Sequence, residues 1–179
     1  AAKSSLIPLF NTLDSVLKTL DYYQPDIVHF CEALIGHTDL ASTCQPLIEL
    51  QQEIKSRYPQ IRIMRSIPII QTGNDNAVPT FEIRDIFEPC SDFLLTDTVL
   101  AAHTEPDNDG QPVAGFVGIT GQTCNWEVAA RLVESSKIPV ILAGGISPEN
   151  VIDGIERVRP SGVDSCTLTN AHDENGSPI

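Results

Sequence analysis

Basic side chains are scarce in this sequence, and long apolar runs are absent. Lysine and arginine together number 11 against 24 aspartates and glutamates, so the net charge is -13 at pH 7. A surface this negative repels nucleic-acid backbones and anionic lipid, which argues against a nucleic-acid or membrane-surface role. No apolar run approaches the ~20 residues that a membrane-spanning helix needs. A small anionic ligand remains compatible with this charge, provided that the positive potential that attracts it is confined to the binding site.

Paired cysteine motifs and the common nucleotide-binding loops are also absent. The number of cysteines is odd, their spacing is wide and no CxxC occurs. This pattern argues against a disulfide framework and a structural zinc site, so we expect a reducing, cytoplasmic compartment and no metal. Neither GxGxxG after a strand nor a P-loop motif occurs, so the sequence offers no common nucleotide site.

The sequence is instead an alternation of apolar runs and amphipathic segments. Its 179 residues, 41% of them hydrophobic, fit one folded domain over 1–179 and exclude a disordered chain. Hydrophobic periodicity predicts strands at 5–10, 26–31, 61–69, 93–98, 139–145 and 162–168. It predicts helices after a cap at Asn11 or Thr12, from Pro46 to Arg57, over 82–88, from Trp126 to Ser136 with Asn125 as cap, and from a Ser147 cap to Val158.

Strands that alternate with helices indicate a parallel sheet with right-handed crossovers. A doubly wound sheet and a (β/α)8 barrel both fit this order. Asp97 is the first candidate for chemistry, because it lies near the end of the predicted strand 93–98 and shares a face with Leu95. An acid in an apolar run must be paired, hydrogen-bonded or functional. A carboxylate that caps the next loop is the alternative to a functional role.

Two glycine-containing loops follow predicted strands. Gly144 and Gly145 precede a predicted helix, an arrangement in which backbone N–H groups can approach a phosphate. The same pair also suits an ordinary tight turn. The loop from Gly118 to Trp126, which contains Gly121, is compatible with a mobile cover over a substrate and equally with a plain connection.

Three polar residues lie inside other predicted strands. His29 and Cys31 share one face of strand 26–31. Such a pair can form a reactive thiolate, but it is more often a buried, satisfied histidine beside an inert thiol. Arg65 can supply local positive charge for an anionic ligand, or it can pair with Asp97 or another buried acid.

Taken in order, these segments resemble the phosphoribosylanthranilate isomerase family. FLLTDT (93–98) is similar to the family's strand with the general acid, and GITGQTCNW (118–126) to its glycine-rich loop. PVILAGGISPENV (139–151) is similar to its seventh strand and the helix that follows, and VRPSGVD (158–164) to the start of its eighth strand. SLIPLF (5–10) and DIVHFC (26–31) match strands three and four more weakly. The order of the pieces is more specific than any one piece.

The resemblance implies a (β/α)8 TIM barrel and an enzyme of tryptophan biosynthesis. The family catalyses the Amadori rearrangement of N-(5-phosphoribosyl)anthranilate without cofactor or metal. The resemblance implies that Asp97 protonates the ribose ring oxygen and that the Gly144 and Gly145 amides hold the phosphate of this small substrate. The reaction needs a protonated acid, a base for the C2 proton and donors for a dianion, and desolvation can keep a carboxylic acid protonated.

The sequence departs from the family pattern at several positions. The strand-four Gln-Leu-His-Gly motif reads HFCE (29–32), and the phosphate loop Ser-Ser-Gly after strand eight reads CTL (166–168). The strand-five lysine is Arg65, and the family's strand-one cysteine base has no counterpart here, so Cys31 is the speculative substitute. The residues assigned to substrate or phosphate binding are Gly144, Gly145, Gly121, Arg65, His29, Cys166 and Thr167.

The predicted strands correspond to strand three through strand eight of such a barrel. Six strands leave two open edges, so we expect the sequence to be part of a longer polypeptide, without the first two βα units and the last helix. A dimer that supplies the missing strands is the alternative, so the protein is expected to be a monomer or a homodimer. A divergent barrel enzyme for another phosphorylated molecule and a non-catalytic binding paralogue are the alternative functions.

Overall fold

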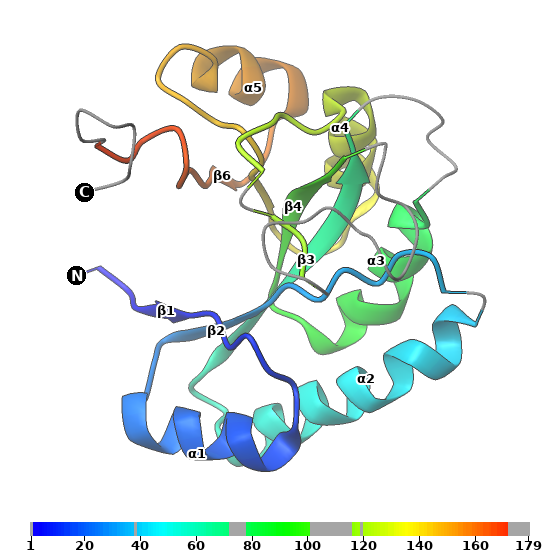
Figure 1. Cartoon of the computed structure of the whole chain (residues 1–179), viewed down its shortest axis with the longest axis vertical. Coiled ribbons are helices and arrows are strands. Elements are labelled where there is room, and N and C mark those ends of the chain that lie inside the picture. The colour runs from blue at the N-terminus through cyan, green and yellow to red at the C-terminus, as the bar shows by residue number, and fades with distance from the viewer. Residues whose placement is uncertain (1, 38, 72–77, 101–115, 119, 172–179) are drawn as a thin grey trace.

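The six strands form one parallel sheet whose order follows the chain. The computed structural model describes residues 2–37, 39–71, 78–100, 116–118 and 120–171. Figure 1 shows a curled sheet with the helices around its outside and with β1 and β6 at its two ends. The strands are β1 (Ser5–Leu6), β2 (Ile27–Phe30), β3 (Arg62–Ile70), β4 (Phe93–Val99), β5 (Val140–Leu142) and β6 (Gly162–Val163). A strand order without reversal is that of a barrel, whereas a doubly wound sheet reverses direction at its centre.

The helices pack on the convex face of this sheet, where most of the core lies. Alternate strand residues point toward them, such as Phe30, Ile63 and Leu94, which are all but completely buried. The opposite, concave face carries the polar residues of the site. The helices are α1 (Leu13–Tyr23), α2 (Leu40–Arg57), α3 (Thr80–Phe87) with the short 3-10 helix η2 (Glu88–Cys90), α4 (Trp126–Ser135) and α5 (Val151–Val158).

Two predicted helix starts were wrong. Helix α2 begins at Leu40 rather than at Pro46, because Asp39 caps it by accepting hydrogen bonds from the N–H and the hydroxyl of Ser42, at 3.0 and 2.7 Å. Pro46 therefore lies inside the helix, where it cannot donate a backbone hydrogen bond. Helix α5 begins at Val151, because Ser147 caps a preceding turn instead, accepting from the N–H of Glu149 at 3.2 Å.

Other predicted boundaries were closer, and the predicted cap at Asn125 is confirmed. Its side chain accepts hydrogen bonds from the backbone N–H groups of Glu127 and Val128, at 3.0 and 3.3 Å. The strands β1, β5 and β6 are shorter than predicted. In β1 the ladder stops at Leu6, two residues before Pro8, and proline has no N–H with which to continue it.

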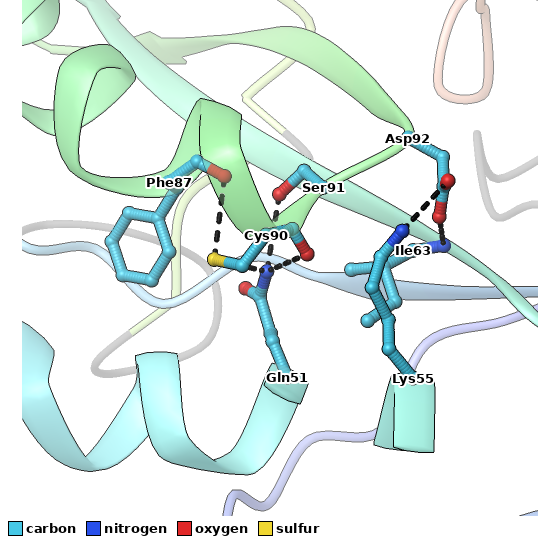
Figure 2. A network of polar contacts seen from close by, with 7 residues as sticks. All are labelled: Gln51, Lys55, Ile63, Phe87, Cys90, Ser91 and Asp92. Carbon is cyan, nitrogen blue, oxygen red and sulfur yellow. Dashed lines mark hydrogen bonds and ion pairs between the residues drawn. The ribbon is translucent and has the colours of Figure 1, made fainter. Parts of the chain in front are cut away.

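A partly buried polar network fixes the amino ends of β3 and β4 (Figure 2). Gln51 of α2, which is fully buried, donates to the Cys90 carbonyl and to the Ser91 hydroxyl, both at 3.1 Å. Asp92 pairs with Lys55 at 2.8 Å and accepts the Ile63 N–H at 2.8 Å. These contacts tie α2 to the ends of the strands opposite the site, which in barrels serve stability.

Candidate active site

The carboxyl ends of the strands surround a cavity of about 200 Å³. Residues in or just after β1, β2, β4, β5 and β6 line it, together with the described residues between 116 and 121. The latter are held beside β2 by a hydrogen bond from the Val117 N–H to the Cys31 carbonyl at 2.8 Å. In parallel β/α folds, ligands bind at this end of the sheet, so the cavity is the candidate active site.

Asp97 projects into this cavity from β4. One carboxylate oxygen accepts the N–H of Thr98 at 3.0 Å, and the other accepts the hydroxyl of Ser66 at 3.4 Å. Burial raises the pKa of Asp97 from 3.8 to about 7 and the charge of Asp164 raises it further, against the lowering effect of both hydrogen bonds. The Thr98 bond is the local contact expected of a loop cap, but the raised pKa leaves a substantial protonated fraction at neutral pH, as a general acid requires.

His29 and Cys31 both line the cavity, but the structure does not couple them to each other. The imidazole Nε2 of His29 lies 2.8 Å from the Ser66 hydroxyl, and burial lowers the pKa of His29 to about 4, with Arg65 adding to the effect. Burial raises the pKa of the Cys31 thiol to about 12. Both shifts favour a neutral imidazole and a neutral thiol, which is the inert arrangement rather than the reactive one.

Arg65 does not supply positive charge to the cavity, which was one of its two predicted roles, because its side chain lies on the helix side of the sheet. It is fully buried, pairs with the Glu32 carboxylate at 2.6 Å and stacks on the Phe87 ring at 4.1 Å. Strand alternation puts Arg65 on the face opposite Ser66, so the guanidinium pairs with a buried acid and does not line the cavity. Among the described residues, no lysine or arginine lines it.

The loop after β5 is held rigidly at the cavity edge. Thr96 accepts the N–H of Ala143 at 2.8 Å and donates to its carbonyl at 2.9 Å, which aligns the following glycines. Gly145 has φ +59°, and a Cβ there would lie 2.5 Å from backbone atoms of Gln122 and Thr123. Within the described part of the chain, the N–H groups of Gly144 and Gly145 have no hydrogen-bond partner. Both glycines line the cavity, so these donors can meet an anion.

The segment after β6 forms the wall next to this loop. Cys166 and Thr167 line the cavity, and Gly121 lies beside them, since a Cβ on Gly121 would be 3.4 Å from the Thr167 methyl. Asp164 lines it too, and burial raises the pKa of that carboxyl group. Asp164 and Ser66 were not among the predicted site residues. Asp164 ends the VRPSGVD segment, which was a usable signal, whereas the small Ser66 in an apolar strand gave none.

Neither a metal centre nor a membrane segment emerges from the described residues. No group of three or more His, Cys, Asp or Glu side chains in these ranges is arranged to hold an ion. None of the helices there has the length and hydropathy that a membrane crossing requires.

Comparison with known proteins agrees with this geometry. A family model described as N-(5'phosphoribosyl)anthranilate (PRA) isomerase matches residues 76–167. The N-(5'-phosphoribosyl)anthranilate isomerase of Methanothrix thermoacetophila is 36% identical over 152 residues, covering 85% of this chain and 56% of that protein. The corresponding protein of Methanosarcina acetivorans is 30% identical over 169 residues, covering 92% of this chain and 61% of that protein.

A solved structure supports the fold. The structure of N-(5'-phosphoribosyl)anthranilate isomerase from Pyrococcus furiosus superposes with a TM-score of 0.59 at 16% identity, covering 98% of this chain and 66% of that one. Curled parallel sheet, outer helices and a strand-end cavity with a buried acid together define a protein of the TIM-barrel type. More narrowly, the chain belongs to the N-(5'-phosphoribosyl)anthranilate isomerase family. It spans about half the length of the curated relatives it matches.

Proposed function

We propose that this chain carries the general acid and the phosphate site of an N-(5'-phosphoribosyl)anthranilate isomerase, in which Asp97 is the acid. The observation that carries the proposal is the Asp97 carboxyl group, whose pKa is raised to about 7 by burial at the end of β4. A carboxylic acid with this pKa is about half protonated at neutral pH and gives its proton up readily, which is the compromise that general acid catalysis needs.

In this proposal Asp97 donates its proton to the ribose ring oxygen. The C1–O bond then breaks, the ring opens and the anthranilate nitrogen carries the positive charge of the resulting iminium group. Loss of the C2 proton to a base gives the enolamine, and its tautomerisation gives the ketose product. The pKa of about 12 leaves the Cys31 thiol almost entirely protonated at neutral pH, so the proposal assigns proton removal at C2 to a group other than Cys31.

The phosphate is proposed to bind where backbone donors gather. Gly144 and Gly145 line the cavity with N–H groups that have no partner among the described residues, and Thr120 and Thr167 belong to the same lining. No basic side chain among the described residues lines the cavity, so neutral hydrogen-bond donors would bind the phosphate dianion. This choice also suits the acid, because a cation near Asp97 would lower the pKa of its carboxyl group.

The isomerase assay on N-(5'-phosphoribosyl)anthranilate tests the proposal, using the complete gene product. Asp97→Asn, which has nearly the same shape and cannot act as an acid, is expected to lower kcat by about 100-fold or more. Cys31→Ser is the matched control in the same cavity and is expected to change kcat by only a few-fold. A thermal unfolding curve of each variant shows that it is folded.

Two outcomes would count against the proposal. Equal turnover by wild type and Asp97→Asn would remove Asp97 from the reaction, and a collapse with Cys31→Ser would restore the thiol as the base. A folded wild-type protein without any turnover, whose melting temperature nevertheless rises with inorganic phosphate, would favour the second candidate, a non-catalytic binding protein. The observation behind this candidate is the CTL sequence at 166–168, where Leu168 is 44% exposed at the cavity wall.

A further inference from the structure

Three side chains form a continuous polar row behind the proposed acid. His29 of β2, Ser66 of β3 and Asp97 of β4 come from three neighbouring strands. The His29 Nε2 is 2.8 Å from the Ser66 Oγ, and this oxygen is 3.4 Å from the Asp97 Oδ2. Ser66 is fully buried and His29 is 7% exposed, so little solvent reaches the contact between them.

A serine hydroxyl has one proton to donate, so Ser66 cannot donate to both neighbours at once. When Asp97 is ionised, its carboxylate needs a donor, and Ser66 serves it while the Nε2–H of His29 donates to the Ser66 oxygen. When Asp97 is protonated, its own O–H donates to the Ser66 oxygen, and Ser66 turns to donate to Nε2. In this second state the ring proton of His29 must sit on Nδ1.

Neutral histidine can take both roles, because it has one N–H and one lone pair in either tautomer. Burial holds the pKa of His29 at about 4, so the ring is neutral wherever Asp97 titrates. The imidazole carries one proton in both states, and its exchange between the two nitrogens through solvent water changes no net charge.

We propose that Ser66 and His29 are positioning residues that form a reversible hydrogen-bond relay behind Asp97, with the tautomer of His29 following the protonation state of the acid. The relay rests on the proposed function for its role in the reaction. It keeps the carboxyl group hydrogen-bonded before and after proton donation, and it favours the ionised product of that donation. Without Ser66, the acid would release its proton less easily.

Other titratable groups face this row, and their charges affect the pKa values of Asp97 and His29. Asp164, after β6, raises the pKa of Asp97 by its charge, and the thiols of Cys31 and Cys124 lie near Asp97 with pKa values of about 12. Both thiols are neutral through the neutral range. The charge of Arg65 acts on His29 from the opposite face, where Arg65 is paired with Glu32. Asp164 is therefore the only one of these neighbours whose titration could overlap with that of Asp97.

Nitrogen-15 NMR of the histidine ring, on the complete gene product labelled at histidine, tests the relay without requiring turnover. In the wild type, the tautomer ratio of His29 is expected to change with an apparent pKa near 7 while the ring stays neutral. In Asp97→Asn this transition should vanish, whereas in Asp164→Asn it should persist at a lower pH. A His29 tautomer that stays constant while Asp97 titrates would overturn the relay.

A hydroxyl deletion provides the second readout. Ser66→Ala is expected to raise the pKa of Asp97 by about half to one pH unit, because a hydrogen bond to the ionised carboxylate is lost. The alkaline limb of the kcat profile should move upward by the same amount, and Ser66→Thr, which keeps the hydroxyl, should restore it. The control is Ser91→Ala, another buried serine, in the network of Figure 2.

The readouts separate failure of the relay from failure of the proposed function. If Ser66→Ala and Ser91→Ala leave the pKa of Asp97 equally unchanged, the relay is wrong whatever the enzyme does. If the His29 transition is present but no isomerase activity is found, the relay stands and the assignment of the reaction is wrong.

Discussion

Replacing Asp97 by asparagine is expected to stabilise the fold at neutral and alkaline pH. The carboxyl group has a pKa of about 7 in the folded protein against 3.8 as its ordinary value. The folded state therefore binds this proton more tightly than the unfolded state between about pH 4 and pH 7. Stability falls as the pH rises through this window, and above it the whole cost of burying the carboxylate is present.

The size of this cost follows from the two pKa values. Their difference of about 3, at about 1.4 kcal/mol per pH unit, corresponds to about 4 kcal/mol. Water that reaches Asp97 through the cavity mouth screens part of the effect, so we expect about 2 to 4 kcal/mol. The asparagine side chain can still accept the Thr98 N–H and carries no charge to bury.

Urea denaturation of wild type and Asp97→Asn at about pH 4 and about pH 8 measures the difference. The variant should be more stable by the stated amount at the higher pH and nearly equal to wild type at the lower. Asp153→Asn, on the exposed start of α5, is the control and should show no such contrast. A stability gain that is the same at both pH values, or a loss at the higher one, would refute the reasoning about a buried carboxylate.

Two further predictions concern the glycine loop and the buried ion pair. Gly145→Ala should lower the free energy of unfolding by at least about 2 kcal/mol, because the added Cβ would be strained at a positive φ and would clash with backbone atoms. Gly162→Ala, whose Cβ would meet only a side chain at 3.1 Å, should lower it less. Denaturant midpoints of the two variants measure the difference. Arg65→Met should destabilise by about 3 to 5 kcal/mol by leaving Glu32 unpaired, and adding Glu32→Gln should recover part of this loss in a double-mutant cycle. Full additivity of the two substitutions would contradict the pairing.

The fold was predictable because its signal is repeated along the chain. Each apolar run followed by an amphipathic segment indicates a βα unit, and five such units followed by a sixth strand leave few parallel topologies. Boundaries were less predictable where capping chemistry was ambiguous. Pro46 is a good first residue for a helix, yet α2 begins six residues earlier, at Leu40, with Asp39 as its cap. Packing of its first two turns against the core offsets the hydrogen bond that Pro46 cannot make.

The candidate site was predictable where a residue type is unusual for its surroundings. An aspartate in FLLTDT and a glycine pair after a strand are both conspicuous, and the structure places Asp97, Gly144 and Gly145 around one cavity. Ser66 was not predictable, since a small hydroxyl in an apolar strand draws no attention until its neighbours are known.

By itself, the sequence determined the order of the elements, their parallel arrangement and the strand ends at which polar groups gather. Only the tertiary structure decided which side chains of each strand point toward the barrel interior. Buried parallel strands are apolar on both faces, so alternation tells that Arg65 and Ser66 point in opposite directions but not which one meets the site. Packing of Phe87 and Glu32 against Arg65 settles that choice. The same contacts leave Ser66 beside Asp97, where the pKa of the carboxyl group depends on the water that the folded chain excludes.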